Sequence, residues 1–224
     1  VNLALAGQDD KIAMLARGED PYCDMASLIF GFLVTKAMKP ERQTGKNSVL
    51  GLGFQMGAPK FRDKYAKDKP LEWCKDIVDT FRQKWAPGIP KVWYGLEQAA
   101  VKTVWDGTPH EAFGVEYRIE DLWLTARLPS GRKLWYYNPQ KIRKAMPWDP
   151  TDIRRAWTYQ AMKMGKWRTI DAYGGHLTEN VVQALARDLM VCAMFKAEEN
   201  GFPIVLTVHD ELLAEPERAN ADQK

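Results

Sequence analysis

The end of the chain carries a pattern that few folds can accommodate. Two short apolar segments, 205–208 and 212–214, lie on either side of His209, Asp210 and Glu211. Apolar, β-branched segments around a short polar turn predict an antiparallel β-hairpin. A tight turn fixes the directions of its side chains, so Asp210 would be a rigid oxygen ligand facing outward. A polar hairpin turn is common without any function, and Mg²⁺ usually needs further carboxylates, waters or substrate phosphates besides one Asp.

Glycine and proline mark the ends of several helices. Asp20 and Pro21 form a favourable helix start, as N-cap and first helical residue, and Gly31 ends that helix. Pro40 begins the next helix, which we expect to reach the glycines at 51–53. We also predict helices at 1–7, 9–18, 71–86 and near 150–164, and a β-hairpin at 122–137 that turns at 129–131.

A long helix is predicted immediately before the terminal hairpin. Thr178 can cap it, and Gly201 follows its last residue, Asn200. We expect its buried face to consist of Val182, Leu185, Leu189 and Cys192.

The predicted helix after Pro40 has one stripe of unusual composition. Arg42, Lys46, Leu50 and Phe54 are spaced four residues apart, which places them along one slowly winding stripe. The stripe is cationic at one end and apolar at the other, like a nucleoside triphosphate, which has anionic phosphates, a sugar and a flat base. Glycines at 51 and 53 would let a ligand approach closely. An amphipathic surface helix would show a similar pattern, so both interpretations stay open.

Charge and composition narrow the class of protein. Residues 36–69 hold nine Lys and Arg against three Asp and Glu, which fits a solvated surface or a footprint for a polyanion. All nine tryptophans lie within 73–167 and are typical of a core, although base stacking is an alternative. Three dispersed cysteines predict a reduced, cytoplasmic protein, and the three histidines lack zinc-ligand spacing. No apolar segment is long enough to span a membrane.

Four segments in order resemble family A DNA polymerases, the family of bacterial DNA polymerase I, and especially its phage members. They are LALAGQDD…GEDPYCDMAS…FG (3–31), R-x-x-x-K-x-x-x-L-G-x-x-F (42–54), YGGHLTENVVQALARD (173–188) and VHDE (208–211). The resemblance implies an α+β chain with part of the right-hand polymerase fold. Residues 1–8 would end a palm helix, 9–175 would form mostly helical fingers, and 176–224 would supply a palm helix and the catalytic antiparallel hairpin.

The resemblance assigns nucleotide contacts to the predicted stripe. Arg42 and Lys46 would hold the dNTP triphosphate, and Lys46 would also protonate the leaving pyrophosphate. Leu50 would lie against the deoxyribose, and Phe54 would guard the template-base pocket. Tyr22 lies where some members carry a phosphate-contacting His.

The same resemblance assigns the remaining roles to the end of the chain. Gln183 and Asn180 would contact the primer–template minor groove, and His209 would lie near the primer end. Asp210 would be a ligand of Mg²⁺, with two ions expected in the complete enzyme, and Glu211 a supporting carboxylate. The reaction would be attack of a primer 3′-hydroxyl on the α-phosphate of a dNTP.

Several residues depart from the family pattern. Leu50 stands where the family often has Phe or Tyr, and Phe54 stands where Tyr is usual. Gln55 stands where Gly is common. The family's first catalytic motif would end before Val1, and the thumb and exonuclease segments are not recognised. We therefore expect the chain to be a fragment that lacks primer-extension activity alone, in the cytoplasm of a phage-infected bacterium. Its expected partners are primer–template DNA, dNTPs and the remainder of the polypeptide, with no membrane.

Two other classes of protein remain open. A non-catalytic nucleic-acid-binding module would use the basic segment and the tryptophans, but it would gain nothing from Asp210 facing DNA phosphates. A single-subunit RNA polymerase fragment is the other alternative, and sugar preference would distinguish it.

Overall fold

The computed structural model describes residues 1–146 and 149–216. The chain divides into two compact units, and the second begins at Val182. The chain is mixed helix and sheet, in agreement with the expected α+β class. The predicted domain boundaries after residues 8 and 175 stay predictions.

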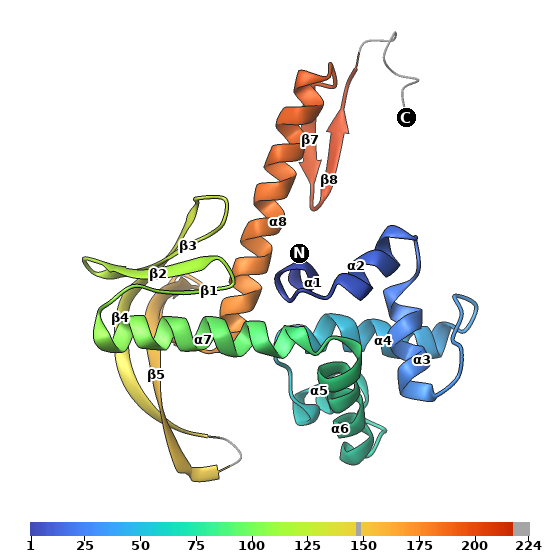
Figure 1. Cartoon of the computed structure of the whole chain (residues 1–224), viewed down its shortest axis with the longest axis horizontal. Helices are drawn as coiled ribbons and strands as arrows, with labels where there is room; N and C mark the ends of the chain where they lie inside the picture. The colour runs from blue at the N-terminus through green and yellow to red at the C-terminus, as the bar shows by residue number, and fades with distance from the viewer. Residues whose placement is uncertain (147–148, 217–224) are drawn as a thin grey trace. The chain divides into compact units, whose positions relative to one another are not determined.

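The first half of the first unit is helical (Figure 1). Asp20 caps α3 as predicted, because its Oδ1 accepts from the amides of Tyr22 at 2.9 Å and Cys23 at 3.3 Å. Gly31 follows α3 in the left-handed conformation, at φ 74°. The predicted helix at 71–86 is α6 followed by a π-helical segment, η1. The helices are α1 (Asn2–Leu5), α2 (Asp9–Ala16), α3 (Pro21–Phe30), α4 (Lys39–Leu52), α5 (Ala58–Tyr65), α6 (Leu71–Asp79), η1 (Thr80–Trp85) and α7 (Gly88–Asp106).

Aromatic side chains form the core between these helices. Phe61, Phe81, Trp85 and Trp93 are all buried in one cluster. The indole N–H groups of Trp85 and Trp93 also form hydrogen bonds there. Trp85 Nε1 donates to Asp24 Oδ2 at 2.8 Å, and Trp93 Nε1 donates to the carbonyl of Gly53 at 2.9 Å. The core therefore ties α3, η1, α7 and the end of α4 together.

An antiparallel sheet with strands in sequential order follows α7. The predicted hairpin at 122–137 is confirmed as β3 paired with the first part of β4. Two of the turns, at 113–114 and 164–165, have positive φ at both residues, which suits the twist of a two-residue hairpin. The strands are β1 (His110–Ala112), β2 (Val115–Glu120), β3 (Trp123–Arg127), β4 (Lys133–Met146), β5 (Asp149–Lys163) and β6 (Lys166–Ala172).

The predicted helix near 150–164 is wrong, because this segment is strand β5. Its Arg, Ala, Gln, Met and Lys residues favour a helix locally. Pairing with β4 on one edge and β6 on the other overrides that preference. Trp157 and Tyr159, two residues apart, are both buried, as expected when alternate side chains of a strand face the core.

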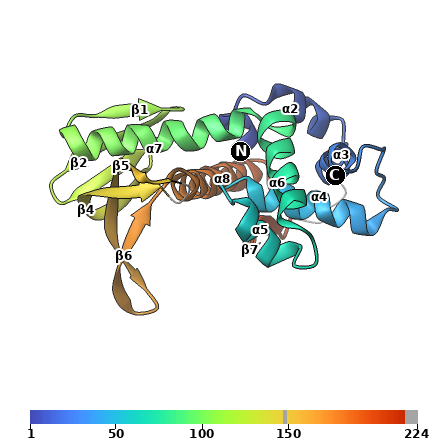
Figure 2. The same cartoon turned by 90° about the horizontal axis from the view of Figure 1, so that it is seen from below.

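Helix α7 covers one face of this sheet. Trp105 Nε1 of α7 donates to the carbonyl of Ala156 in β5 at 3.0 Å, and Thr103 bonds to the carbonyl of Tyr117 in β2. Tyr117, Leu124 and Tyr136 are buried on this side. Figure 2 shows α7 alongside β1 and β2.

Helix α8 (Gly174–Glu199) starts four residues before the predicted cap. Thr178 lies inside the helix, and its hydroxyl donates to the carbonyl of Gly174 at 2.8 Å. The second unit contains the part of α8 from Val182 and the predicted hairpin, now β7 (Ile204–Val208) and β8 (Glu211–Ala214). The expected buried face of α8 is wrong for this structure, because Leu189 and Cys192 are exposed and no described residue after Ala184 is fully buried.

The start of α8 depends on two glycines. A Cβ on Gly174 would lie 2.4 Å from the carbonyl oxygen of Trp93, and a Cβ on Gly175 would lie 2.3 Å from that of Phe54. Gln55 then completes the contact, because its Oε1 accepts from the amide of Gly175 at 2.7 Å. Gln55 itself has a φ of 66°, a conformation that favours glycine.

We predict that Gln55→Ala is less stable than Gln55→Gly by about 1 kcal/mol, since a non-glycine residue in the left-handed region is strained. Both variants lose the bond to Gly175, so that loss cancels in the comparison. Urea unfolding followed by circular dichroism measures the difference. An alanine variant as stable as the glycine variant would contradict the prediction.

Candidate nucleotide site and hairpin tip

Helices α3 and α4 are in direct backbone contact at Gly45. A Cβ on Gly45 would lie 2.0 Å from the carbonyl oxygen of Tyr22 and 3.0 Å from both the Cβ and the amide nitrogen of Ala26. No flexible side-chain end relieves this contact, so any larger residue must push the helices apart. The close approach brings the beginning of α3 against the cationic part of α4.

Asp20 joins the two helices by a second interaction. Its Oδ2 accepts from Arg42 Nε at 2.8 Å, while its Oδ1 caps α3. The Asp20 side chain is 9% exposed and that of Arg42 is 32% exposed. The sequence predicted Asp20 only as a helix cap, since nothing local indicates a partner 22 residues away.

The surroundings of Asp20 favour the ionised form of its carboxyl group. Burial alone would raise the pKa of Asp20, but hydrogen bonds from Arg42 and from the amides of Tyr22 and Cys23 outweigh burial and lower that pKa. Because the folded-state pKa is the lower one, this network stabilises the fold above the unfolded pKa of about 3.9. The contribution is lost as the pH falls through the folded-state pKa.

The ring of Tyr22 brings both predicted phosphate ligands together. The Arg42 guanidinium carbon lies 5.2 Å from the ring centroid, and Lys46 Nζ lies 5.9 Å from it. These distances are within the range of cation–π attraction. No carboxylate among the described residues forms an ion pair with Lys46, so its charge is available to an anion.

Of the two apolar residues of the predicted stripe, Leu50 lies on α4 and Phe54 does not. Leu50 is 52% exposed and follows Lys46 on the same face of α4. Phe54 lies beyond the end of α4, in a turn, and is half-buried. Gly51 is buried near Tyr65 and Met56, so its missing side chain serves internal packing. This corrects the expectation that it leaves space for a ligand.

Asn180 and Gln183, the two helix residues expected to contact the primer–template, differ in their surroundings. Asn180, in the first unit, donates from Nδ2 to the Tyr136 hydroxyl at 3.2 Å. Gln183 is exposed in the second unit. The two residues thus belong to different compact units of the chain.

The hairpin tip has the predicted geometry. Val208 pairs with Glu211, so His209 and Asp210 form a two-residue loop. His209 has a φ of 54°, and Asp210 and Glu211 are exposed. The residues that the structure describes contain no group of three or more His, Cys, Asp or Glu placed to hold a metal. As a metal ligand, the exposed Asp210 would therefore need water or phosphate ligands besides its own oxygens.

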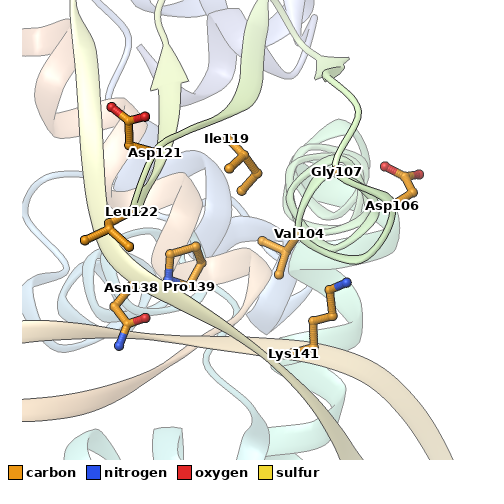
Figure 3. Close-up of a pocket in the computed structure, with 9 residues that line it drawn as sticks. All are labelled: Val104, Asp106, Gly107, Ile119, Asp121, Leu122, Asn138, Pro139 and Lys141. Carbon is orange, nitrogen blue, oxygen red and sulfur yellow. The ribbon is translucent and has the colours of Figure 1, made fainter.

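A separate cavity of about 340 Å³ lies at the end of α7 (Figure 3). It contains none of the predicted site residues. Its lining combines the end of α7, the β2–β3 turn and the irregular part of β4: Val104, Asp106, Gly107, Ile119, Asp121, Leu122, Asn138, Pro139 and Lys141.

The chain is 31% identical over 220 residues to a DNA polymerase of Bacillus phage SP02. The chain is similar to a phage DNA polymerase. The match covers 96% of the chain but only 33% of the phage protein, so the chain spans about a third of that relative's length. No model of a known protein family matches the chain.

Two further expectations concern cysteines and membranes. Cys23, Cys74 and Cys192 are free thiols, and the first two are buried. Within 1–146 and 149–216, no helix combines the length and apolar character that crossing a bilayer requires.

We predict that Gly45→Ala destabilises the chain by about 1–3 kcal/mol, the usual cost of overpacking. An exposed helix position would respond in the opposite direction, because alanine is the better helix former by about 1 kcal/mol. Gln43→Ala, on the exposed side of α4, is the matched control and should change the free energy of unfolding by less than about 0.5 kcal/mol. A Gly45→Ala variant at least as stable as the wild type in urea unfolding would contradict the helix contact.

Proposed function

We propose that the chain is the fingers and part of the palm of a family A DNA polymerase, which acts in template-directed DNA synthesis. In this proposal α3 and α4 bind the incoming dNTP, and the β7–β8 hairpin provides one carboxylate of the catalytic centre. The observation that carries it is the arrangement of Arg42 and Lys46 on one partly exposed face of α4, next to Tyr22 and followed by exposed Leu50. The similarity to a phage DNA polymerase is in agreement with it.

The chemistry of this face suits a triphosphate. Lys46 offers a compact positive charge that no carboxylate of the described residues pairs, and Arg42 is held in orientation by Asp20. A guanidinium already fixed by a carboxylate loses less conformational freedom when it meets a phosphate. Leu50, one turn further along α4, presents an apolar surface at the place where a sugar would follow the phosphates. In the proposed reaction Lys46 also donates a proton to the leaving pyrophosphate.

The hairpin would act through its fixed acidic tip. Asp210 would be a ligand of Mg²⁺, with Glu211 nearby as a supporting carboxylate and His209 beside the primer end. Such ions, when bound, neutralise charge on the transferring phosphate. The exposed carboxylate of Asp210 fits this role as one of several donors, and the others would come from water, substrate and the remainder of a longer polypeptide. Asn180 and Gln183 would contact the primer–template duplex.

Binding of dATP to the chain tests this proposal by isothermal titration calorimetry in the presence of Mg²⁺. Lys46→Ala should weaken binding about 10-fold or more, because a hydrogen bond to a charged group contributes about 1.5–3 kcal/mol. Lys64→Ala is the matched control: Lys64 Nζ also lies over a tyrosine, 5.0 Å from the ring centroid of Tyr65, but on α5. The control should bind dATP like the wild type.

Two outcomes would contradict the proposal. One is equal affinity of the wild type and Lys46→Ala for dATP. The other is DNA binding with no detectable affinity for dATP, which would instead favour a non-catalytic nucleic-acid-binding module.

A further inference from the structure

The face of the sheet opposite α7 carries a row of aromatic side chains. Alternate residues of a strand point to opposite faces, so Trp123, Trp135 and Tyr137 face away from the buried Leu124 and Tyr136. Trp167 of β6 joins them, with its ring centroid 5.6 Å from that of Tyr137. We define these four residues, Trp123, Trp135, Tyr137 and Trp167, as the aromatic face.

The four rings form a continuous series. The ring centroid of Trp123 lies 5.9 Å from that of Trp135 and 4.9 Å from that of Tyr137. Trp135 is 52% exposed and Trp167 is 58% exposed, although large aromatic side chains normally lie in the core. In contrast, Trp85, Trp93 and Trp157 are fully buried.

The positive charge of the strands that carry the aromatic face favours an anionic ligand. Residues 132–172, which contain β4, β5 and β6, hold ten Lys and Arg against three Asp and Glu. Two carboxylates of the neighbouring strand β2 are already paired. Glu116 accepts from Arg118 and Arg127, and Glu120 accepts from Lys133. Lys133 Nζ also lies 5.6 Å from the ring centroid of Trp135.

We propose that the aromatic face binds single-stranded nucleic acid, with bases stacked on Trp135 and Trp167 and phosphates near the cations of β4–β6. Exposed aromatic rings beside positive charge are the combination that binds single strands without sequence preference, because every base has a π-face. A duplex keeps its bases stacked inside and offers no such surface. This surface is distinct from the α3–α4 nucleotide site and does not depend on its proposed function.

Fluorescence anisotropy with a labelled oligothymidylate of about 15 nucleotides tests the proposal on the whole 224-residue chain. The double variant Trp135→Ala, Trp167→Ala should bind at least about 10-fold more weakly, because each stacked base contributes measurably to affinity. The double variant Trp135→Phe, Trp167→Phe should retain affinity within about 3-fold, since phenylalanine also stacks. Tyr94→Ala is the control, because Tyr94 is similarly exposed but lies on α7.

Two further probes separate stacking from charge. An abasic oligonucleotide of equal length, which has the phosphates but no bases, should bind more weakly than oligothymidylate. A duplex of the same length should be insensitive to the alanine variants. Ultraviolet cross-linking followed by mass spectrometry should place the oligothymidylate on β4 and β6.

Several results would overturn the proposal. They are unchanged oligothymidylate binding by the alanine double variant, loss of binding in the phenylalanine variant, or equal binding of the abasic strand. Circular dichroism shows whether each variant is folded. Arg42→Ala should leave oligothymidylate affinity unchanged and the tryptophan variants should leave dATP affinity unchanged, so failure of one proposal is distinguishable from failure of the other.

Discussion

The contact between Gly45 and the backbone of Tyr22 is the constraint on which the rest of the candidate nucleotide site depends. Only a residue without a Cβ allows α3 and α4 to approach this closely. The approach lets Asp20 cap one helix and bind Arg42 of the other. It also places the Tyr22 ring beside Arg42 and Lys46. A fixed pair of cations thus results from packing of the backbone, before any ligand is present.

Features set by neighbouring residues were predictable from the sequence, and features set by distant ones were not. Asp20, Pro21 and Gly31 delimit α3 as expected, and the hairpin tip at 209–210 forms as expected, because caps and turns are local. Strand β5 was mistaken for a helix because its partners, β4 and β6, decide its conformation. Helix α7 was not predicted, although its buried residues recur at helical spacing. The partnership of Asp20 with Arg42 has no local signal at all.

The first unit has two chemically different surfaces that we propose as binding surfaces for nucleic-acid components. The α3–α4 face holds two cations beside the ring of Tyr22, and this concentrated positive charge suits the phosphates of one nucleotide. The aromatic face of the sheet spreads four rings over three strands, which suits successive bases of a strand. An enzyme that copies a template must handle both kinds of component, so the two proposals are compatible while each rests on its own contacts.

The most direct test of the central claim is the chemical reactivity of Lys46 with and without nucleotide. Acylation of the lysines, measured residue by residue by mass spectrometry, compares Lys46 with Lys64 in the presence of dATP and Mg²⁺. If Lys46 binds the triphosphate, dATP should protect Lys46 from acylation and leave Lys64 unchanged, and deoxyadenosine should protect neither. Equal acylation of Lys46 with and without dATP would contradict the claim that α4 binds the nucleotide.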